Sequence, residues 1–183
     1  MSRVVGEVAA RLSGSDLRSI GRADAVSSEI LRRPSLAAEA VRLLSDSDAV
    51  LRARAADALE KAARVSPSIV RPHRRRLLRL LENVTQQEVR WHLAQLMPRL
   101  QLTPRERPRV LAVLRRYLDD PSRIVQVCAM QGLWELTEDG SREPWIRLWV
   151  QRAATHAAPS IRARARRLLS RPGSCIRLGS RES

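Results

Sequence analysis

Apolar residues recur along this chain at intervals of three and four residues, the spacing that places them on one stripe of an α-helix. Leu77, Leu80 and Leu81 form such a stripe, and Leu114 and Leu118 belong to another. No segment alternates apolar and polar residues with a period of two, which is the pattern of a half-buried strand. The chain is therefore predicted to fold as an all-α protein.

The expected helices begin at a proline or at a short polar side chain. Proline suits the first turn of a helix, because the amide hydrogen that it lacks would have no intrahelical partner there. Ser47 or Asp48 can cap a helix, since a short side-chain oxygen accepts free amide hydrogens of the first turn. We expect helices near residues 2–12, 15–31, 34–45, 47–64, 67–83, 85–100, 104–119, 121–138, 142–157 and 159–170.

Three markers keep a common period of 36–38 residues along the chain. Prolines that open expected helices are Pro34, Pro72, Pro108 and Pro144. Similar segments of nine residues start at Leu51, Val89, Val125 and Ile161. Arginines followed by an apolar or aromatic residue are Arg42, Arg79 and Arg116. Internal periods of this size are typical of solenoids, in which each unit buries its apolar face against its neighbours.

The period divides residues 1–170 into one solenoid of helix pairs, followed by a C-terminal tail of residues 171–183. Small residues at inner positions, such as Ala129 and Gly132, are expected to let paired helices approach closely. The expected units are residues 15–45, 47–83, 85–119 and 121–157, with a half unit at 159–170.

These units resemble the HEAT repeat. Asp46 stands six residues before Arg52, which follows the aliphatic Leu51, and alanine-rich apolar positions and a proline-started second helix come next. The resemblance covers about residues 15–170 and implies a right-handed α-α superhelix of stacked helix pairs. It also implies that the second helices line the concave side. HEAT-like proteins include adaptors, nucleic-acid binders and a few enzymes, so the fold alone does not define the function.

Two of the repeats depart from this pattern. Asp120 is followed by Gln126 where the arginine is expected, and Arg90 has Val84 where the aspartate is expected. The HEAT resemblance implies that Arg52, Arg90 and Arg162 brace neighbouring repeats by bonding to the aspartate of the loop.

The chain carries a formal net charge of +15, which attracts polyanions and acidic partners over a Debye length. All its basic residues but Lys61 are arginines, a skew that a GC-rich genome also produces. Solvated helix faces are therefore an alternative explanation of the excess.

Some arginines nevertheless recur in register. A helical wheel places Arg79 away from Leu77 and Leu81, and the register repeats it at Arg42, Arg116 and Arg152. The neighbouring Arg75, Arg76 and Arg109 broaden this predicted basic column, which the resemblance places inside the curve. Such a column can bind a phosphate backbone or an acidic protein segment by charge-assisted hydrogen bonds, or it can pair with acids of adjacent repeats.

Trp145, Leu148 and Trp149 fall on one side of an expected helix, beside Arg152. An exposed surface of this kind is a candidate anchor for a partner, because tryptophan and arginine dominate binding energies at interfaces. The alternative is that the last helix or the tail from Arg171 covers it.

Candidate catalytic chemistry is sparse in this sequence. His73, His92 and His156 have no metal-ligand spacing, and His92 is expected on a helix surface. Trp134 and Glu138 distantly resemble the tryptophan and acid of HEAT-like alkylpurine DNA glycosylases. No cofactor is expected.

Nothing in the sequence predicts a membrane span or a secretory signal, and two cysteines do not make a disulfide framework. The interpretation is a cytoplasmic, non-catalytic HEAT-like scaffold that binds a protein partner, expected to be an acidic segment, through an arginine-lined concave surface and a tryptophan-rich face. Nucleic acid is the alternative ligand, and the oligomeric state is left open. Acids such as Glu39 and Glu82 within the arginine column would favour protein, whereas a continuous arginine surface would favour nucleic acid.

Overall fold

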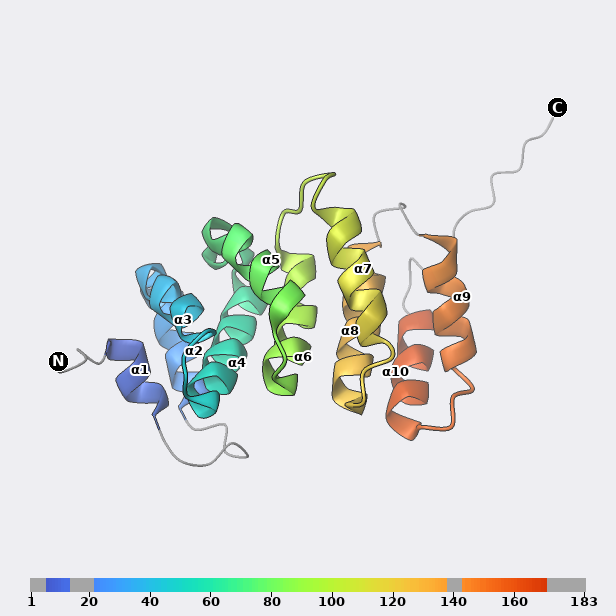
Figure 1. Cartoon of the computed structure of the whole chain (residues 1–183), viewed down its shortest axis with the longest axis horizontal. Helices are drawn as coiled ribbons and strands as arrows, with labels where there is room; N and C mark the ends of the chain where they lie inside the picture. Colours follow the sequence, from blue (N-terminus) through green and yellow to red (C-terminus); the bar gives the residue numbers. More distant parts are fainter. Residues whose placement is uncertain (1–5, 14–21, 138–142, 171–183) are drawn as a thin grey trace.

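The computed structural model of the chain describes residues 6–13, 22–137 and 143–170, and within them the protein is helical with no strand, as the apolar spacing predicts (Figure 1). The α-helices are α1 (Glu7–Leu12), α2 (Ala23–Arg32), α3 (Ala37–Leu43), α4 (Ala49–Val65), α5 (Arg74–Asn83), α6 (Gln87–Leu96), α7 (Arg107–Tyr117), α8 (Arg123–Leu136), α9 (Pro144–Ala153) and α10 (Pro159–Leu169). Short 3-10 segments are η1 (Pro34–Leu36), η2 (Pro67–Ile69), η3 (Arg71–His73) and η4 (Met97–Arg99).

Prolines open helical segments as predicted, but the helices expected over 34–45 and 67–83 are divided. Pro34 starts η1 ahead of α3, and η2 and η3 both contain a proline and precede α5. Pro72 has no amide hydrogen to donate to a carbonyl one turn earlier, so a continuous α-helix from Pro67 would lose a hydrogen bond there. The α-helical part therefore begins only at Arg74.

Asp48 rather than Ser47 caps α4. Its carboxylate accepts hydrogen bonds from the backbone N–H of Val50 at 2.7 Å and of Leu51 at 3.4 Å. These amides belong to the first turn and have no carbonyl partner inside the helix. The cap fixes where the longest described helix starts.

The helices follow one another along the long axis of the molecule, from α1 at one end to α9 and α10 at the other (Figure 1). The helices α2, α4, α6, α8 and α10 pack against each other in sequence, and we call them the inner layer. The helices α3, α5, α7 and α9 make fewer contacts with one another, and we call them the open layer. The core between the layers is continuous and consists mainly of leucine, valine and alanine.

Contacts between the layers group the helices differently from the expected units. The open-layer helices α3, α7 and α9 each pack chiefly on the helix that follows, through loops 44–48, 118–122 and 154–158. The expected units 47–83 and 121–157 join each open-layer helix to the helix before it instead. Chain order alone does not decide this grouping; the short loops do, because they hold the two helices of a hairpin together.

Gly132 explains how closely two inner-layer helices approach. A Cβ atom at this position would lie 2.4 Å from the carbonyl oxygen of Ala94 on α6 and 3.3 Å from a methyl of Leu114. The expected close approach is therefore present, although it joins α8 to α6 of the same layer rather than the two members of one pair. Only glycine fits this contact without displacing the backbone of α6.

No described helix is both long enough and apolar enough to cross a lipid bilayer.

Candidate functional site

The four arginines of the predicted column lie on the open layer. Arg42, Arg79, Arg116 and Arg152 belong to α3, α5, α7 and α9 respectively, and all four are exposed. Among the described residues none of them has a carboxylate within ion-pair distance. Arg42, Arg116 and Arg152 stand in the last turn of their helices, where the helix dipole stabilises a cation. This effect does not occupy the hydrogen-bond donors of the guanidinium groups, which therefore stay available to a ligand.

The predicted column lies on the layer whose helices contact one another less, and its place inside a curve stays a prediction. The inner layer packs more closely than the open layer. Arg79 and its counterparts therefore lie on the side with separated helices.

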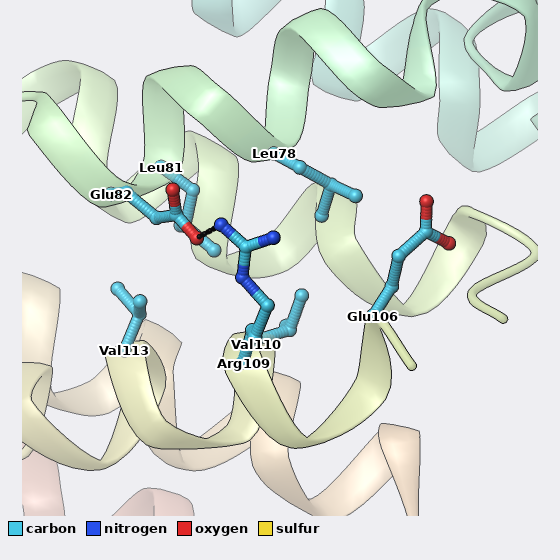
Figure 2. A pocket seen from close by; sticks show the side chains of 7 residues that line it. All are labelled: Leu78, Leu81, Glu82, Glu106, Arg109, Val110 and Val113. Atoms are coloured by element: carbon cyan, nitrogen blue, oxygen red, sulfur yellow. Dashed lines mark hydrogen bonds and ion pairs between the residues drawn. The ribbon is translucent and has the colours of Figure 1, made fainter. Parts of the chain in front are cut away.

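Arg109 is not free like the arginines of the column. Its Nη2 lies 2.7 Å from an Oε of Glu82, so the side chain bridges from α7 to α5 above Leu78 and Val110 (Figure 2). Although its side chain is 70% exposed, Arg109 and Glu82 compensate each other's charge. The ion pair spans the groove between α5 and α7, which leaves only a small cavity there.

Arg75 is exposed, whereas Arg76 is half-buried and turns towards α3. Arg76 and Arg42 line a cavity of about 460 Å³ between α1, α3 and α5, together with Glu39 and Asp46. Glu39 accepts hydrogen bonds from the first amides of α1, at 3.0 and 3.1 Å. The acid expected to interrupt the column is thus already engaged by the N-terminal helix.

The tryptophan surface is only partly as predicted. Leu148 is 54% exposed, but Trp145 and Trp149 are half-buried and pack against the core. A helical wheel does not show these neighbours: both rings pack against the core, and Arg115 of α7 lies over the ring of Trp145.

Between α7 and α9 the structure has a hollow of about 300 Å³, which we call the tryptophan hollow. Its lining residues are Arg115, Leu118, Asp119, Trp145, Leu148, Trp149 and Arg152. The described part of α10 does not line it, so that helix is not the predicted cover. The tail from Arg171 lies outside the described residues.

Arg115 is the residue of this hollow that sequence reasoning missed. Its guanidinium carbon lies 4.9 Å from the centroid of the Trp145 ring, which is a cation–π arrangement. The sequence signal for it was its place directly before Arg116. Consecutive side chains on a helix point about 100° apart, and in this structure Arg115 points to Trp145 on α9.

The arginines expected as braces bond to loops of the inner layer, but only Arg90 of the three is shown bonding to an aspartate side chain, and Arg52 and Arg162 bond to backbone carbonyls. Arg52 donates to the carbonyls of Asp46 and Ser47 at 2.7 and 3.0 Å and to the side chain of Gln86 at 2.6 Å. Arg162 bonds in the same way to the carbonyls of His156 and Ala157. The guanidinium therefore closes the loop before its own helix.

Arg90 reaches further and pairs with the buried carboxylate of Asp120 in the next loop. Where the sequence has Gln126 instead of arginine, its amide donates to the carbonyl of Asp120 at 2.6 Å. Glutamine thus keeps the loop contact without the charge. These braces are structural, in line with the role that the resemblance implied for them.

A second polar row crosses the inner layer and was not predicted. Glu60 is buried, with 1% exposure, and pairs with Arg64 on its own helix and with Arg99 at 3.7 Å. Arg99 in turn lies 3.9 Å from Glu135 on α8. The repeat period places Lys61, Arg99 and Glu135 at one position, which is the signal that would have revealed the row.

The contrast between the layers is informative about function. Charged side chains of the inner layer contact each other across the repeats, so they contribute to stacking. On the open layer, Arg109 and Arg115 also make such contacts, but the four arginines of the column have no carboxylate partner among the described residues, so ion pairing within the stack does not account for them.

His92 is half-buried with its Nδ1 enclosed, and is not a freely exposed residue of the helix surface as expected. Its ring lies 4.8 Å from that of Trp91, and its Nδ1 has no hydrogen-bond partner in the described structure. Burial, the largest effect, lowers the pKa of His92, while the carboxylates of Asp57 and Glu60 oppose that shift. The folded protein therefore holds this imidazole in its neutral form, and protonating it in place costs free energy.

We therefore expect acid to destabilise the protein in part through His92. The unfolded chain takes up the proton near pH 6.5, whereas the folded protein takes it up only at a lower pH. The histidine costs no stability above pH 6.5, and the free energy of unfolding falls as the pH drops from 6.5 through the folded pKa. Urea unfolding at pH 7.5 and 5.0 should show a smaller difference for His92→Gln than for the wild type; equal differences would contradict the assignment.

Residues with other candidate chemistry lie in the core. Trp134 is 1% exposed, so it is not available to stack on an extruded base, and Glu138 lies outside the described residues. Cys128 is buried as predicted, and burial raises the pKa of its thiol to about 12. Across the described ranges no three His, Cys, Asp or Glu side chains are grouped to hold a metal ion.

No protein-family model matches this chain, and no curated protein matches it.

Proposed function

We propose that this protein is a non-catalytic binding module built as a HEAT-like, right-handed superhelix of stacked helix pairs. Its ligand is an acidic segment of a partner protein, which lies across the open layer. The observation that carries the proposal is the column of four exposed arginines without a carboxylate partner, at Arg42, Arg79, Arg116 and Arg152. A guanidinium binds a carboxylate through two parallel hydrogen bonds, so a column of them suits a run of aspartate and glutamate.

The tryptophan hollow favours protein over nucleic acid as the ligand. It adds an exposed leucine and two half-buried tryptophans to the end of the arginine column. A protein segment carries apolar side chains that such a hollow can take, whereas a phosphate backbone does not.

Nucleic acid is the second candidate, and the state of two acids favours it. Glu82 is paired with Arg109, and Glu39 is bonded to the amides of α1, so neither compensates the arginines of the column. A surface on which arginines outnumber the acids left to compensate them is the electrostatic footprint of a nucleic-acid binder.

A salt series distinguishes the two ligands. An acidic peptide of about 20 residues and a 20-base-pair DNA duplex are titrated into the full chain from about 50 to 200 mM salt. We expect the peptide to bind more tightly than DNA at the upper end, because its side chains also contact apolar surface. Tighter binding of DNA, with log affinity falling by about 0.9 per phosphate contact against log salt, would overturn the protein-ligand proposal.

A further inference from the structure

The tryptophan hollow has a composition that separates it from the rest of the open layer. The grooves at α3 and α5 hold arginines with acids beside them, whereas this hollow combines two indole rings, Leu148 and two arginines with Asp119. Exposed large hydrophobic side chains among the described residues are Val65, Ile124 and Leu148. Leu148 is the one that stands beside the tryptophans.

The hollow is small for a ligand pocket, which suits a single large side chain. Its volume of about 300 Å³ is at the low end of the range of roughly 300–1,000 Å³ that small-molecule pockets occupy. Its apolar surface comes from Leu118, Trp145, Leu148 and Trp149. Indole rings that are already packed against the core lose little conformational freedom on binding, which favours their use as a fixed contact surface.

The rim of the hollow is set up to bind carboxylates. Arg115 stacks on Trp145 with 4.9 Å between its guanidinium carbon and the ring centroid, and this stacking holds the planar group in place. The N–H groups of a stacked guanidinium lie in its own plane, so its edge is free to donate to an acid. Arg152 stands on the same rim from α9 and is exposed. Asp119 is the acid of the lining, and two arginines outweigh it.

We infer that this hollow is the anchor site of the acidic segment: it takes one bulky apolar side chain, aromatic or leucine-like, flanked by aspartate or glutamate. This inference rests on the proposed function, because the arginine column is what gives the segment its acidic character. The chain's own tail does not fit this chemistry. Residues 171–183 contain three arginines and one glutamate, so they carry the same sign of charge as Arg115 and Arg152.

Three labelled peptides of equal length test the anchor by fluorescence anisotropy with the full chain. The first is rich in Asp and Glu with a central Trp, the second has Ser in place of that Trp, and the third keeps the Trp but has Asn and Gln in place of the acids. We expect the first to bind at least about tenfold more tightly than the second, and the third to bind most weakly. Equal affinity of the first two would overturn the anchor and leave the acidic-segment proposal standing.

Failure of the proposed function gives a different result. If the second peptide does not bind at all and the third binds as well as the first, the acidic-segment proposal falls, and with it the carboxylate-binding rim, while the apolar contact of the hollow stands. If none of the three binds, both fall.

Leu148→Ala locates the anchor, with Ile124→Ala as the matched control. Both side chains are large, apolar and exposed, but Ile124 lies on α8, outside the hollow. We expect Leu148→Ala to weaken the Trp peptide about fivefold or more and to leave the Ser peptide unchanged, while Ile124→Ala changes neither. Equal effects of the two variants would place the apolar contact elsewhere.

A truncated chain tests the competing occupant. Removing residues 171–183 should leave the affinity for the Trp peptide within about twofold of the full chain. A large gain in affinity on truncation would show that the tail fills the hollow, and would overturn the assignment to a partner segment.

Discussion

Reversing three arginines of the open layer, Arg79→Glu, Arg116→Glu and Arg152→Glu together, is expected to abolish binding of an acidic segment and leave the fold intact. An exposed charge contact contributes about 0.2–1 kcal/mol, and reversal replaces it by repulsion of similar size. Three sites then change the binding free energy by about 1–6 kcal/mol, and the middle of that range corresponds to a loss of affinity of roughly 100-fold. Anisotropy titration with the acidic peptide measures it.

The fold should survive because the three side chains are exposed and have no ion-pair partner among the described residues. A matched control reverses Arg22, Arg123 and Arg167, which are also exposed; Arg123 and Arg167 belong to the inner layer, and Arg22 immediately precedes its first helix, α2. Each reversal lowers the charge by two, so both triple variants carry +9 in place of +15. Equal loss of binding in both variants would mean that net charge, not the open layer, attracts the ligand. A lower melting temperature in the first variant alone would mean that its arginines stabilise the stack.

Leu81→Ala is expected to produce the largest loss of stability from a single truncation that we predict. Leu81 is 1% exposed, and with Leu77 it forms the fully buried part of α5. Truncating a buried leucine costs about 2–5 kcal/mol, since it removes apolar contacts and leaves a cavity. For a chain of this length we expect the melting temperature to fall by roughly 5–20 °C.

Urea unfolding followed by circular dichroism at 222 nm measures this loss, with Leu78→Ala as the control. Leu78 is on the same helix but half-buried, and it borders the groove towards α7. The control should lose clearly less than Leu81→Ala. An unchanged unfolding midpoint for Leu81→Ala would contradict the packing of α5 against its neighbours.

Tyr117 illustrates how the open layer is tied together without its arginines. Its hydroxyl donates to the carbonyl of Leu81 at 2.8 Å, which joins α7 to α5 in the core. Burial raises the pKa of this phenol to about 12. Cohesion of this layer therefore comes from buried groups, which is why the exposed arginines can be reversed.

Residues of the candidate site were predictable to different degrees. The exposure of Arg42, Arg79, Arg116 and Arg152 followed from their angle to the leucine stripe on their own helix. The ion pair of Arg109 with Glu82 could not be predicted in this way, because Glu82 lies on α5 and Arg109 on α7. Whether the two side chains meet depends on the distance between these two helices.

The sequence by itself determined the local structure of this protein. Apolar spacing, prolines at helix starts and the 36–38-residue period required only neighbours along the chain, and they sufficed to predict a strand-free, all-α chain with nearly every described helix. The loop-closing role of Arg52 was also local, because its carbonyl partners precede it by five and six residues.

Only the tertiary structure shows which helix each helix packs against. A helical wheel gives the angle of a side chain about its own axis, but not what occupies that direction. The half-burial of Trp145, Trp149 and His92, the burial of Glu60, and the position of Arg115 over Trp145 all depend on the packing of a second helix. For the same physical reason the hollow between α7 and α9 exists only once both helices are in place.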